Sequence, residues 1–327
     1  MRIFRGLPRP THAVPTALTI GNFDGVHLGH QAMLRELKKQ ADQRGLTTCV
    51  MTFAPHPREY FAAQFPSSPA AQNVPKRIDT LRDKLAAIQA CGIDRVVILP
   101  FNAALASMSP ESFVSDLLVA GLQTKFLLIG DDFRFGAKRA GDFAQLASMA
   151  SRMGYDLQAM PSVEASGMRV SSSAVRSALS DGRLQDAAAM LGRPYTISGH
   201  VVHGAKLGRD LGFPTLNVAF KHPHPAASGI FVVRLLGLVD TPLVGVANLG
   251  TRPALDPSDV NGGRVLLETY CLDWPATLGA NGGYGKIVSA QLLHKLHDEL
   301  AYDGLESLKL GIQNDIVLAK DFLSKNA

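Results

Sequence analysis

The chain has 327 residues, of which 46% are hydrophobic and 19% charged; this is typical of a soluble globular protein too long for one ordinary core. The net charge is +5, and the sequence contains no block of like charges, so a nucleic-acid-binding tail is not expected. A mildly basic surface nevertheless attracts small anions such as ATP. No apolar run is long enough to span a membrane or to serve as a signal segment, so we expect a cytoplasmic protein with neither membrane nor nucleic-acid partners.

The first informative stretch is a glycine-rich turn, GNFDGVHLGH, at residues 21–30. Residues 18–20 predict the end of a buried strand, and an amphipathic helix follows from Gln31. Glycines let the backbone approach a ligand closely, and a helix N-terminus attracts phosphate through unpaired N–H groups. His27 and His30 are three residues apart and face one side of a first helical turn, although simple helix capping is the commoner role of such histidines.

Strand-like and helix-like runs alternate through the first half of the chain. We expect further strands at 47–53, 95–99, 125–129 and 155–160, and helices at 78–91, 110–120 and 142–153. This alternation predicts a parallel sheet with helices on both faces, which binds its ligands at the carboxyl ends of the strands.

Two further stretches are placed to reach the same edge of that sheet. Residues 130–136 follow a strand and contain Asp132. In residues 169–176, the serines 171–173 and Arg176 would form a phosphate cradle of hydroxyls, N–H groups and a guanidinium. Helix capping is the alternative for the serines, and a solvated loop charge is the alternative for Asp132.

The pattern changes within residues 184–193. A short helix at 184–191 ends at Gly192, and β-type runs replace helices beyond it, at 195–202, 215–219, 230–236, 243–248, 265–272 and 286–293. A final helix covers roughly 305–322. We therefore predict two domains, 1–185 with the parallel sheet and 186–327 with an antiparallel barrel or sandwich.

The second domain has a candidate site of its own in GHVVHGAKLGRDLGFPTLN, residues 199–217. Its glycines predict turns in which the backbone cradles phosphate. Thr215 and Asn217 share a strand face and offer the oxygens that Mg²⁺ prefers, unless they are only a polar pair on a wet face. Glu268 stands in the apolar run VLLETYCL, where it is either a solvent-facing residue or a general base for a substrate hydroxyl.

Together these motifs resemble the bacterial bifunctional riboflavin kinase/FAD synthetase family over nearly the whole chain. The markers are GNFDGVHLGH, PHP, IGDDFRFGAKRAG and RVSSSAVR in the first half, and GRDLGFPTLN, GIF, GVANLGTRP and Glu268 in the second. The resemblance implies a Rossmann-like FMN adenylyltransferase domain followed by a riboflavin kinase domain with a six-stranded antiparallel β-barrel. Riboflavin would be phosphorylated by ATP to FMN and ADP, and FMN would react with ATP to give FAD and pyrophosphate, with Mg²⁺ as cofactor.

The resemblance also implies residue roles. His27 and His30 would steady the ATP phosphates, and Glu268 would accept the proton of the ribityl 5′-hydroxyl. The adenylyltransferase nucleotide pocket would include Gly21, Asn22, Phe23, Asp24, Gly29, Asp132, Arg169, Ser171, Ser172, Ser173 and Arg176. The kinase would bind nucleotide and flavin through Gly204, Lys206, Gly208, Arg209, Thr215 and Asn217, the last two also holding Mg²⁺.

Four features depart from the family pattern. Ser173 stands where threonine is usual, Ala254 where a threonine commonly follows Arg-Pro, and His297 where arginine is frequent. Residues 275–283 are glycine-rich and lack the usual acidic residue before Tyr284. The last three concern the loops that would close over the flavin, and so bear on riboflavin affinity.

Two other functions fit part of the pattern. One is an H-x-G-H adenylyltransferase for a different acceptor, with the barrel as an accessory domain; the other is a non-enzymatic regulator that binds flavin or nucleic acid. Thr215, Asn217 and Glu268 argue against both, because a binding module has no use for metal ligands plus a base. The expected partners are therefore small molecules, with the choice between monomer and homo-oligomer left open.

Overall fold

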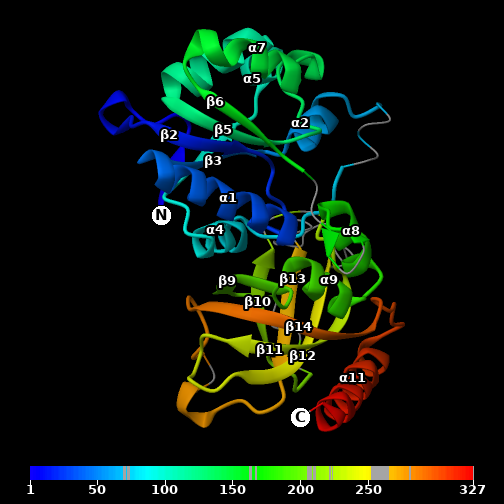
Figure 1. Cartoon of the computed structure of the whole chain (residues 1–327). Helices are drawn as coiled ribbons and strands as arrows, with labels where there is room; N and C mark the ends of the chain where they lie inside the picture. The colour runs from blue at the N-terminus through cyan, green and yellow to red at the C-terminus, as the bar shows by residue number, and fades with distance from the viewer. Residues whose placement is uncertain are drawn as a thin grey trace. The chain divides into compact units, whose positions relative to one another are not determined.

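The chain folds into two compact units. The computed structural model describes residues 1–68, 71, 74–161, 164–165, 168–204, 208, 211–220, 222, 224–251, 265–279 and 281–326. The first unit holds residues 1–75 and 84–171, and the second holds residues 76–83 and 172–327. Each is built around its own sheet (Figure 1).

The first unit is a six-stranded parallel sheet. Its strands, in spatial order, are β1 (Arg2–Arg5), β4 (Arg95–Pro100), β3 (Thr47–Ala54), β2 (Thr16–Ile20), β5 (Thr124–Gly130) and β6 (Asp156–Met160). The helical segments between them are η1 (Pro10–His12), α1 (Leu28–Arg44), α2 (Pro57–Gln64), α4 (Leu81–Ala90), α5 (Ala103–Ser107), α6 (Pro110–Ser112), η2 (Phe113–Gly121), η3 (Ala137–Arg139) and α7 (Phe143–Met153). A small hairpin, β7 (Glu164–Ala165) with β8 (Met168–Arg169), follows β6.

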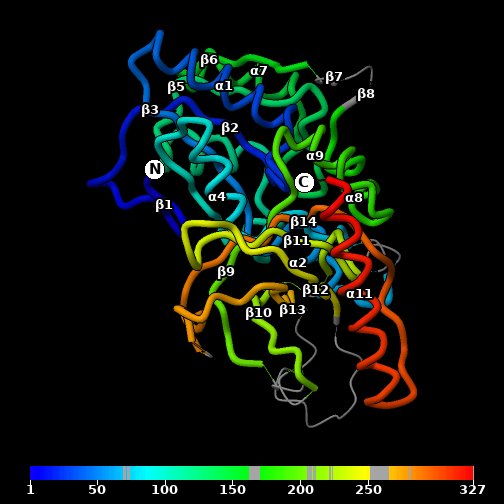
Figure 2. Tube along the Cα trace, turned by 90° about the horizontal axis from the view of Figure 1, so that it is seen from below, coloured from blue at the N-terminus to red at the C-terminus, as the bar shows by residue number. Residues whose placement is uncertain are grey.

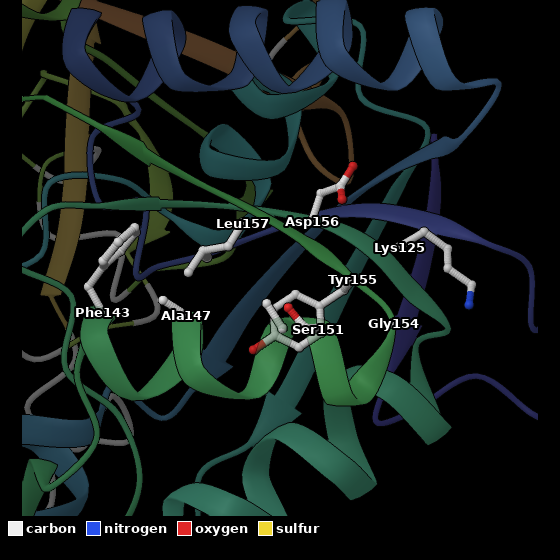
Figure 3. A pocket seen from close by; sticks show the side chains of 9 residues that line it. Lys125, Phe143, Ala147, Ser151, Gly154, Tyr155, Asp156 and Leu157 are labelled. Atoms are coloured by element: carbon white, nitrogen blue, oxygen red, sulfur yellow. The ribbon is translucent and has the colours of Figure 1, made fainter.

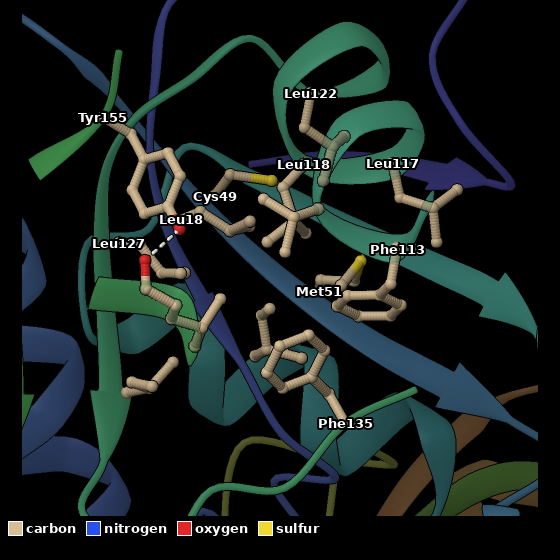
Figure 4. Packing of buried hydrophobic residues seen from close by; sticks show 14 of the residues in the cluster. Leu18, Cys49, Met51, Phe113, Leu117, Leu118, Leu122, Leu127, Phe135 and Tyr155 are labelled. Carbon is tan, nitrogen blue, oxygen red and sulfur yellow. Dashed lines mark hydrogen bonds between the residues drawn. The ribbon is translucent and has the colours of Figure 1, made fainter. Parts of the chain in front are cut away.

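Both faces of this sheet are covered by helices. Successive side chains of a strand point to opposite faces, and here both sets are apolar. Leu18 packs with η2 and α7 on one face, in the cluster that Figure 4 shows. Its neighbour Ala17 packs with α1 and α4 on the other face. The two helix layers lie on opposite sides of the strands in Figure 1. Hence the strands read as continuous apolar runs, and the parallel sheet predicted from the alternation of elements is confirmed.

The second unit is a closed antiparallel barrel. Its strands, in order around the barrel, are β10 (Thr215–Phe220), β13 (Val265–Cys271), β12 (Leu243–Thr251), β11 (Gly229–Leu236), β14 (Ile287–His297) and β9 (Thr196–Val202). The helical segments are α8 (Ser172–Ser180), α9 (Leu184–Leu191), η4 (Ala276–Leu278) and the C-terminal α11 (Leu305–Lys325). The prediction of a barrel or sandwich with a final helix thus resolves to a barrel.

The long C-terminal helix α11 packs against the outside of the barrel. Ala319 of α11 forms a buried cluster with Val232 of β11 and Val246 of β12. Figures 1 and 2 both show α11 beside β12 and β14. The side chains of β12 that alternate with Val246, such as Ala247, therefore fill the barrel interior, where Ala247 is fully buried.

A short segment of the first half of the chain belongs structurally to the second unit. Residues 76–83 cluster with the barrel, where the Tyr195 hydroxyl donates to the Ile78 carbonyl at 2.8 Å. Arg77 exchanges backbone hydrogen bonds with residues 224 and 226 on either side of Pro225. The division between the two compact units falls after Ser171, because α8 and α9 pack against each other and belong to the barrel unit. The functional domain bounds 1–185 and 186–327 stay a prediction.

Several smaller elements went unpredicted or differ in kind. The edge strand β1 and helix α2 are short, and no period stands out in their sequences. The predicted helix at 110–120 exists, but its longer part, η2, winds as a π-helix. Cys49 and Cys271 are buried free thiols that pack as small apolar residues, and burial raises the pKa of each to about 12.

Candidate functional site

The glycine-rich turn joins β2 to α1 in a conformation that ordinary residues rarely adopt. Phe23, Gly25 and Val26 all have positive φ, at 48°, 87° and 38°. Two of them are not glycine, and a β-branched valine in this region is strained. Such strain is found where surrounding structure enforces a loop shape, commonly at a binding site.

Within this turn the two histidines meet. The ring of His27 stacks on the ring of His30, with centroids 3.7 Å apart. His27 Nδ1 also accepts a hydrogen bond from the backbone N–H of His30 at 3.3 Å, so His27 is the N-cap of α1. Gly29 leaves room for the pair, because a Cβ there would lie 3.2 Å from the His27 ring. The capping role and the proposed ligand role are thus compatible in one side chain.

Asn22 and Asp24 are polar residues of the turn itself. Asp24 is only 1% exposed. The carbonyl of Asn22 accepts a hydrogen bond from Lys84 Nζ at 2.8 Å, whereas its side-chain oxygen is buried with no hydrogen-bond partner among the described residues. A buried acceptor without a partner is costly unless a ligand supplies the donor. Lys84, 5% exposed on α4, escaped the sequence analysis because nothing in its helix marked it as buried.

The second strand-end loop starts beside the first. β5 pairs with β2, so Asp132 and the glycine-rich turn follow neighbouring strands at the same edge of the sheet. A Cβ on Gly130 would lie 3.2 Å from Asp132 Oδ1, which shows the carboxylate folded back over the end of β5. Asp132 therefore lies at the carboxyl-end edge of the sheet, as the sequence analysis expected.

The serine-rich stretch begins in the first unit, which includes Val170 and Ser171. The carbonyl of Val170 lies 3.6 Å from where a Cβ of Gly29 would be, so the chain just before Ser171 runs past the histidine turn. Ser172, Ser173 and Arg176 begin α8 in the second unit, where Arg176 Nε donates to the Lys76 carbonyl at 2.7 Å. The side chain of Arg169 lies outside the described residues. The phosphate cradle predicted for these residues stays a prediction.

An aromatic group that the sequence analysis missed lies at the ends of β3 and β4. Phe53 is the penultimate residue of β3 and Phe101 directly follows β4, and their ring centroids are 5.8 Å apart. Tyr60 and Phe61 of α2 pack on Phe101 at 5.4 and 5.8 Å. Helix α2 starts at the PHP motif, capped by His56. Aromatic spacing across separate strands and a helix has no sequence period, so only the fold brings these rings together.

In the barrel, three polar residues form a row across adjacent strands. Asn217 of β10 is paired with Glu268 of β13, and Glu268 is paired with Asn248 of β12. Directly opposed residues of an antiparallel pair point to the same face, with Cβ atoms about 5 Å apart. The row shares its face with Val246, which packs on α11, so it lies on the outside of the barrel.

Two amide oxygens in this row lack partners. Asn217, 5% exposed, has a buried side-chain oxygen without a hydrogen-bond partner in the described part of the chain, and so does Asn248. Thr215 is two residues before Asn217 on the same face, as predicted from the strand period. Thr215 and Asn217 therefore present the hydroxyl and the unsatisfied amide oxygen that a magnesium ion would accept, and the donor set fits this ion. Asn248 was not singled out by the sequence analysis.

The glycines of the second motif are required by close contacts. A Cβ on Gly204 would lie 2.6 Å from Asn217 Nδ2, and a Cβ on Gly208 would lie 2.5 Å from the Phe213 carbonyl. Both positions therefore bring backbone against the candidate site. Lys206 and Arg209 lie outside the described residues, as does Ala254 among the departures from the family pattern.

Two other departures have a structural account. His297, where arginine is frequent, binds Asp315 of α11 through Nε2 at 2.8 Å. In residues 275–283, the Trp274 indole donates to the Gly279 carbonyl at 2.9 Å and closes the turn around η4. Nothing in the structure explains serine in place of threonine at the exposed position 173.

A hollow of about 540 Å³ in the first unit lies away from this edge. It is found between α7 and the starts of β5 and β6, where Figure 3 shows Lys125, Tyr155 and Asp156. These residues lie at the amino ends of parallel strands, opposite to the edge that carries the histidine turn. The described residues include no cluster of three His, Cys, Asp or Glu side chains placed to hold a metal.

A strained strand-to-helix turn on a parallel sheet and a polar row on a barrel are the features expected of a two-domain transferase that acts on phosphate groups. Family models identify both halves, as FAD synthetase over residues 9–174 and riboflavin kinase over residues 191–323. The chain belongs to the bifunctional riboflavin kinase/FMN adenylyltransferase family. It therefore carries riboflavin kinase and FAD synthetase activities, which rules out the two alternative functions.

Relatives match along the full length. The bifunctional riboflavin kinase/FMN adenylyltransferase of Escherichia coli K12 is 41% identical, covering 98% of each chain. That of Haemophilus influenzae is 38% identical, covering 99% of this chain and 100% of its own. A crystal structure described as a macrolide-efflux protein from Streptococcus pneumoniae shares the fold, with a TM-score of 0.72 at 23% identity over 97% of this chain and 98% of its own. In the described part of the chain, no helix is both long and apolar enough for a membrane span.

Proposed function

We propose that FMN adenylylation takes place at the histidine turn of the first unit. The second phosphate pKa of FMN is about 6, so the acceptor is already mostly dianionic near neutral pH and needs no general base. Its oxygen attacks the α-phosphorus of ATP, and pyrophosphate leaves. The stacked His27 and His30 and the N-terminus of α1 stabilise charge on the phosphates, with serines 171–173 and Arg176 assisting.

The aromatic group at the ends of β3 and β4 suits the flavin ring of FMN. Phe53, Tyr60, Phe61 and Phe101 offer a partly exposed apolar surface at the same edge of the sheet as the histidine turn. Flat aromatic ligands stack on such surfaces. The flavin would then approach from β3 and β4 while the phosphates lie over β2.

In the second unit, the row on the barrel carries riboflavin phosphorylation. A ribityl hydroxyl is much less acidic than a phosphate, so its attack on the γ-phosphorus of ATP benefits from a base. Glu268 takes the hydroxyl proton as the oxygen–phosphorus bond forms and ADP leaves. Thr215 and Asn217 would hold Mg²⁺, which supplies charge neutralisation on the transferred phosphate. The observation that supports this assignment is the buried oxygen of Asn217, which has no hydrogen-bond partner among the described residues and lies next to Glu268.

One assay on one protein tests both assignments. The enzyme is incubated with riboflavin, ATP and Mg²⁺, and flavins are separated by chromatography over time. We expect FMN to appear first and FAD to follow, and we expect EDTA to stop phosphorylation. Riboflavin that yields neither FMN nor FAD would contradict the kinase assignment, and FMN that is never converted to FAD would contradict the adenylyltransferase assignment.

The wider setting follows from these substrates. Both reactions consume ATP, and the matched relatives are bacterial enzymes, which supports a cytoplasmic location. Riboflavin, FMN, FAD, ATP, ADP and pyrophosphate are then the partners. Homo-oligomerisation stays a prediction that light scattering would test.

A further inference from the structure

The polar row continues beyond Glu268 on the side away from the magnesium ligands. Asn217 and Thr215 lie on β10, Glu268 on β13, and Asn248 on β12, so Glu268 is flanked by an amide oxygen on each side. Neighbouring strands are about 4.8 Å apart, so each amide is one strand spacing from the carboxylate. The oxygen of Asn217 has a role in the proposed kinase site, whereas the oxygen of Asn248 has none yet.

The direction of phosphoryl transfer decides what approaches Asn248. In such a transfer the attacking and leaving oxygens are roughly in line with the phosphorus. If ATP phosphates lie on the β10 side of Glu268, the carbon chain of the acceptor must leave on the β12 side. The hydroxyl next to the reacting 5′-hydroxyl then passes over Asn248, and the apolar Ile230, paired with Asn248 on β11, comes next.

A second residue fixes the orientation of Asn248. The carboxylate of Glu299, just beyond β14, lies over Gly250 on the strand face of Asn248 and interacts with the Asn248 side chain. A carboxylate accepts, so the amide nitrogen of Asn248 must donate, and its oxygen turns away from Glu299. Burial raises the pKa of Glu299, and the bond from Asn248 opposes that rise.

The fold makes room for this carboxylate at a glycine. A Cβ on Gly250 would overlap Glu299 Oε1, so any side chain two residues after Asn248 on the same strand face would displace the Glu299 carboxylate. Gly250, Asn248 and Glu299 therefore form one arrangement. This arrangement leaves the Asn248 amide oxygen buried beside Glu268, with no hydrogen-bond partner among the described residues.

Resting on the proposed kinase site, we infer that Asn248 accepts a hydrogen bond from the ribityl 4′-hydroxyl of riboflavin, and that Glu299 is a positioning residue that holds Asn248 for this contact. An acceptor for a non-reacting hydroxyl contributes equally before and in the transition state. Its loss therefore raises KM and leaves kcat unchanged.

The test measures kinase kinetics of N248A, E299Q and the double variant. A neutral hydrogen bond corresponds to a change of about threefold to tenfold, and we expect KM for riboflavin to rise by this factor in N248A and E299Q. KM for ATP and kcat should stay within about twofold of wild type. Because Glu299 acts through Asn248, E299Q should add nothing in the N248A background. G250A, which displaces the carboxylate, should reproduce E299Q.

Controls separate this contact from general damage. Asp303 is an exposed carboxylate four residues after Glu299, and D303N should leave all constants unchanged. A riboflavin analogue without the 4′-hydroxyl should have the same KM with wild type and N248A. FAD formation from supplied FMN should be intact in every variant.

Several results would overturn the inference. An unchanged riboflavin KM in N248A, additive effects in the double variant, or a shift in the Mg²⁺ requirement in place of KM would each do so. A fall in melting temperature together with kcat would make the arrangement merely structural. All of these leave the kinase site in place, whereas wild-type turnover in E268Q would instead remove the site on which the inference rests.

Discussion

His27 combines a structural and a chemical function in one ring. Its Nδ1 accepts the N–H of His30 and caps α1, while its ring face stacks on His30. Capping needs only a short acceptor, which asparagine supplies, whereas phosphate stabilisation needs the imidazole. The two functions can therefore be separated by choice of substitution.

We expect H27N and H27A to lose FAD synthesis alike but to differ in stability. Each should slow adenylyl transfer by about 10²–10³-fold, the effect of losing one electrostatic contact. H27A should also be less stable than H27N by about 1 kcal/mol, the usual value of an N-cap. Adenylyl transfer from supplied FMN and urea unfolding measure the two effects.

Riboflavin phosphorylation by the same samples is the control, and it should be nearly unchanged. H30A should show the same catalytic loss as H27A. Equal loss of both half-reactions would mean that the substitutions damage folding or that the histidines are in the wrong half of the mechanism.

Glu268 can be tested without changing its shape. E268Q keeps a hydrogen-bonding oxygen but cannot take a proton. We expect the kinase rate to fall roughly 10²–10⁴-fold, mainly in kcat, because riboflavin binding does not require the charge. A smaller loss would indicate that Glu268 orients the hydroxyl, since phosphoryl transfer depends strongly on alignment.

FAD synthesis from supplied FMN should survive in E268Q. Both half-reactions are measured on one purified preparation, because a general loss of active protein would lower both rates, whereas loss of the base would lower only the kinase rate. Full kinase turnover would leave the barrel without an identified base.

At the scale of elements, the attachment of α11 to the barrel depends on an ionisable pair. His297 ends β14, donates through Nε2 to Asp315 of α11, and contacts the Asp298 carbonyl through Nδ1 at 2.6 Å. Burial lowers the pKa of His297, but the hydrogen bonds and the charges of Asp315 and Asp298 outweigh it, so the pKa is raised. The Tyr302 hydroxyl also lies near enough to Asp315 for that charge to help raise its pKa.

A raised pKa has a definite sign in stability. The pair contributes fully below the unfolded-state pKa of about 6.5, and its contribution is lost as pH rises through the higher folded-state value. We therefore expect the melting temperature of wild type to fall, relative to H297R, between about pH 6 and pH 8.

H297R is the matched variant because arginine stays charged over this range and is the residue frequent in the family. D315N should remove the pH-dependent difference in both backgrounds. Parallel melting curves of wild type and H297R across the range would show that the His297–Asp315 bond does not secure α11.

At the scale of the whole molecule, the division of labour is testable with fragments. A fragment starting just before Leu184 is expected to fold and to make FMN but not FAD. The structure adds that such a fragment lacks α8 and residues 76–83, and with them the bond from Tyr195 to Ile78 and the bond from the Ser198 N–H to Asp83. We therefore expect it to be less stable than the same barrel in the full chain.

A fragment from Ser172 should be more stable than one from Leu184, because α8 packs on α9. Y195F in the full chain should lower the stability of the barrel by about 1 kcal/mol, the value of one hydrogen bond whose partner stays buried. A folded fragment without kinase activity would contradict the assignment of the activity to the barrel.

The sequence alone determined most of the order of elements and the positions of both motifs. Periodicity is a local property, so strands such as β3 and β10 and helices such as α7 were predicted close to their observed bounds. The two glycine-rich motifs are also contiguous, so His27, His30, Thr215 and Asn217 could be found without a fold. Glu268 could be found because its apolar neighbours isolate it.

Only the tertiary structure decided which distant residues meet. Strand register places Asn248 beside Glu268, sheet order places Phe101 near α2, and the barrel takes up residues 76–83 from the first half of the chain. Lys84 and Glu299 look like ordinary surface charges in sequence, and become informative only when burial and a partner are known. A pairing between segments far apart in the chain produces no hydrophobic periodicity in either segment, so it cannot be predicted from the sequence of either one.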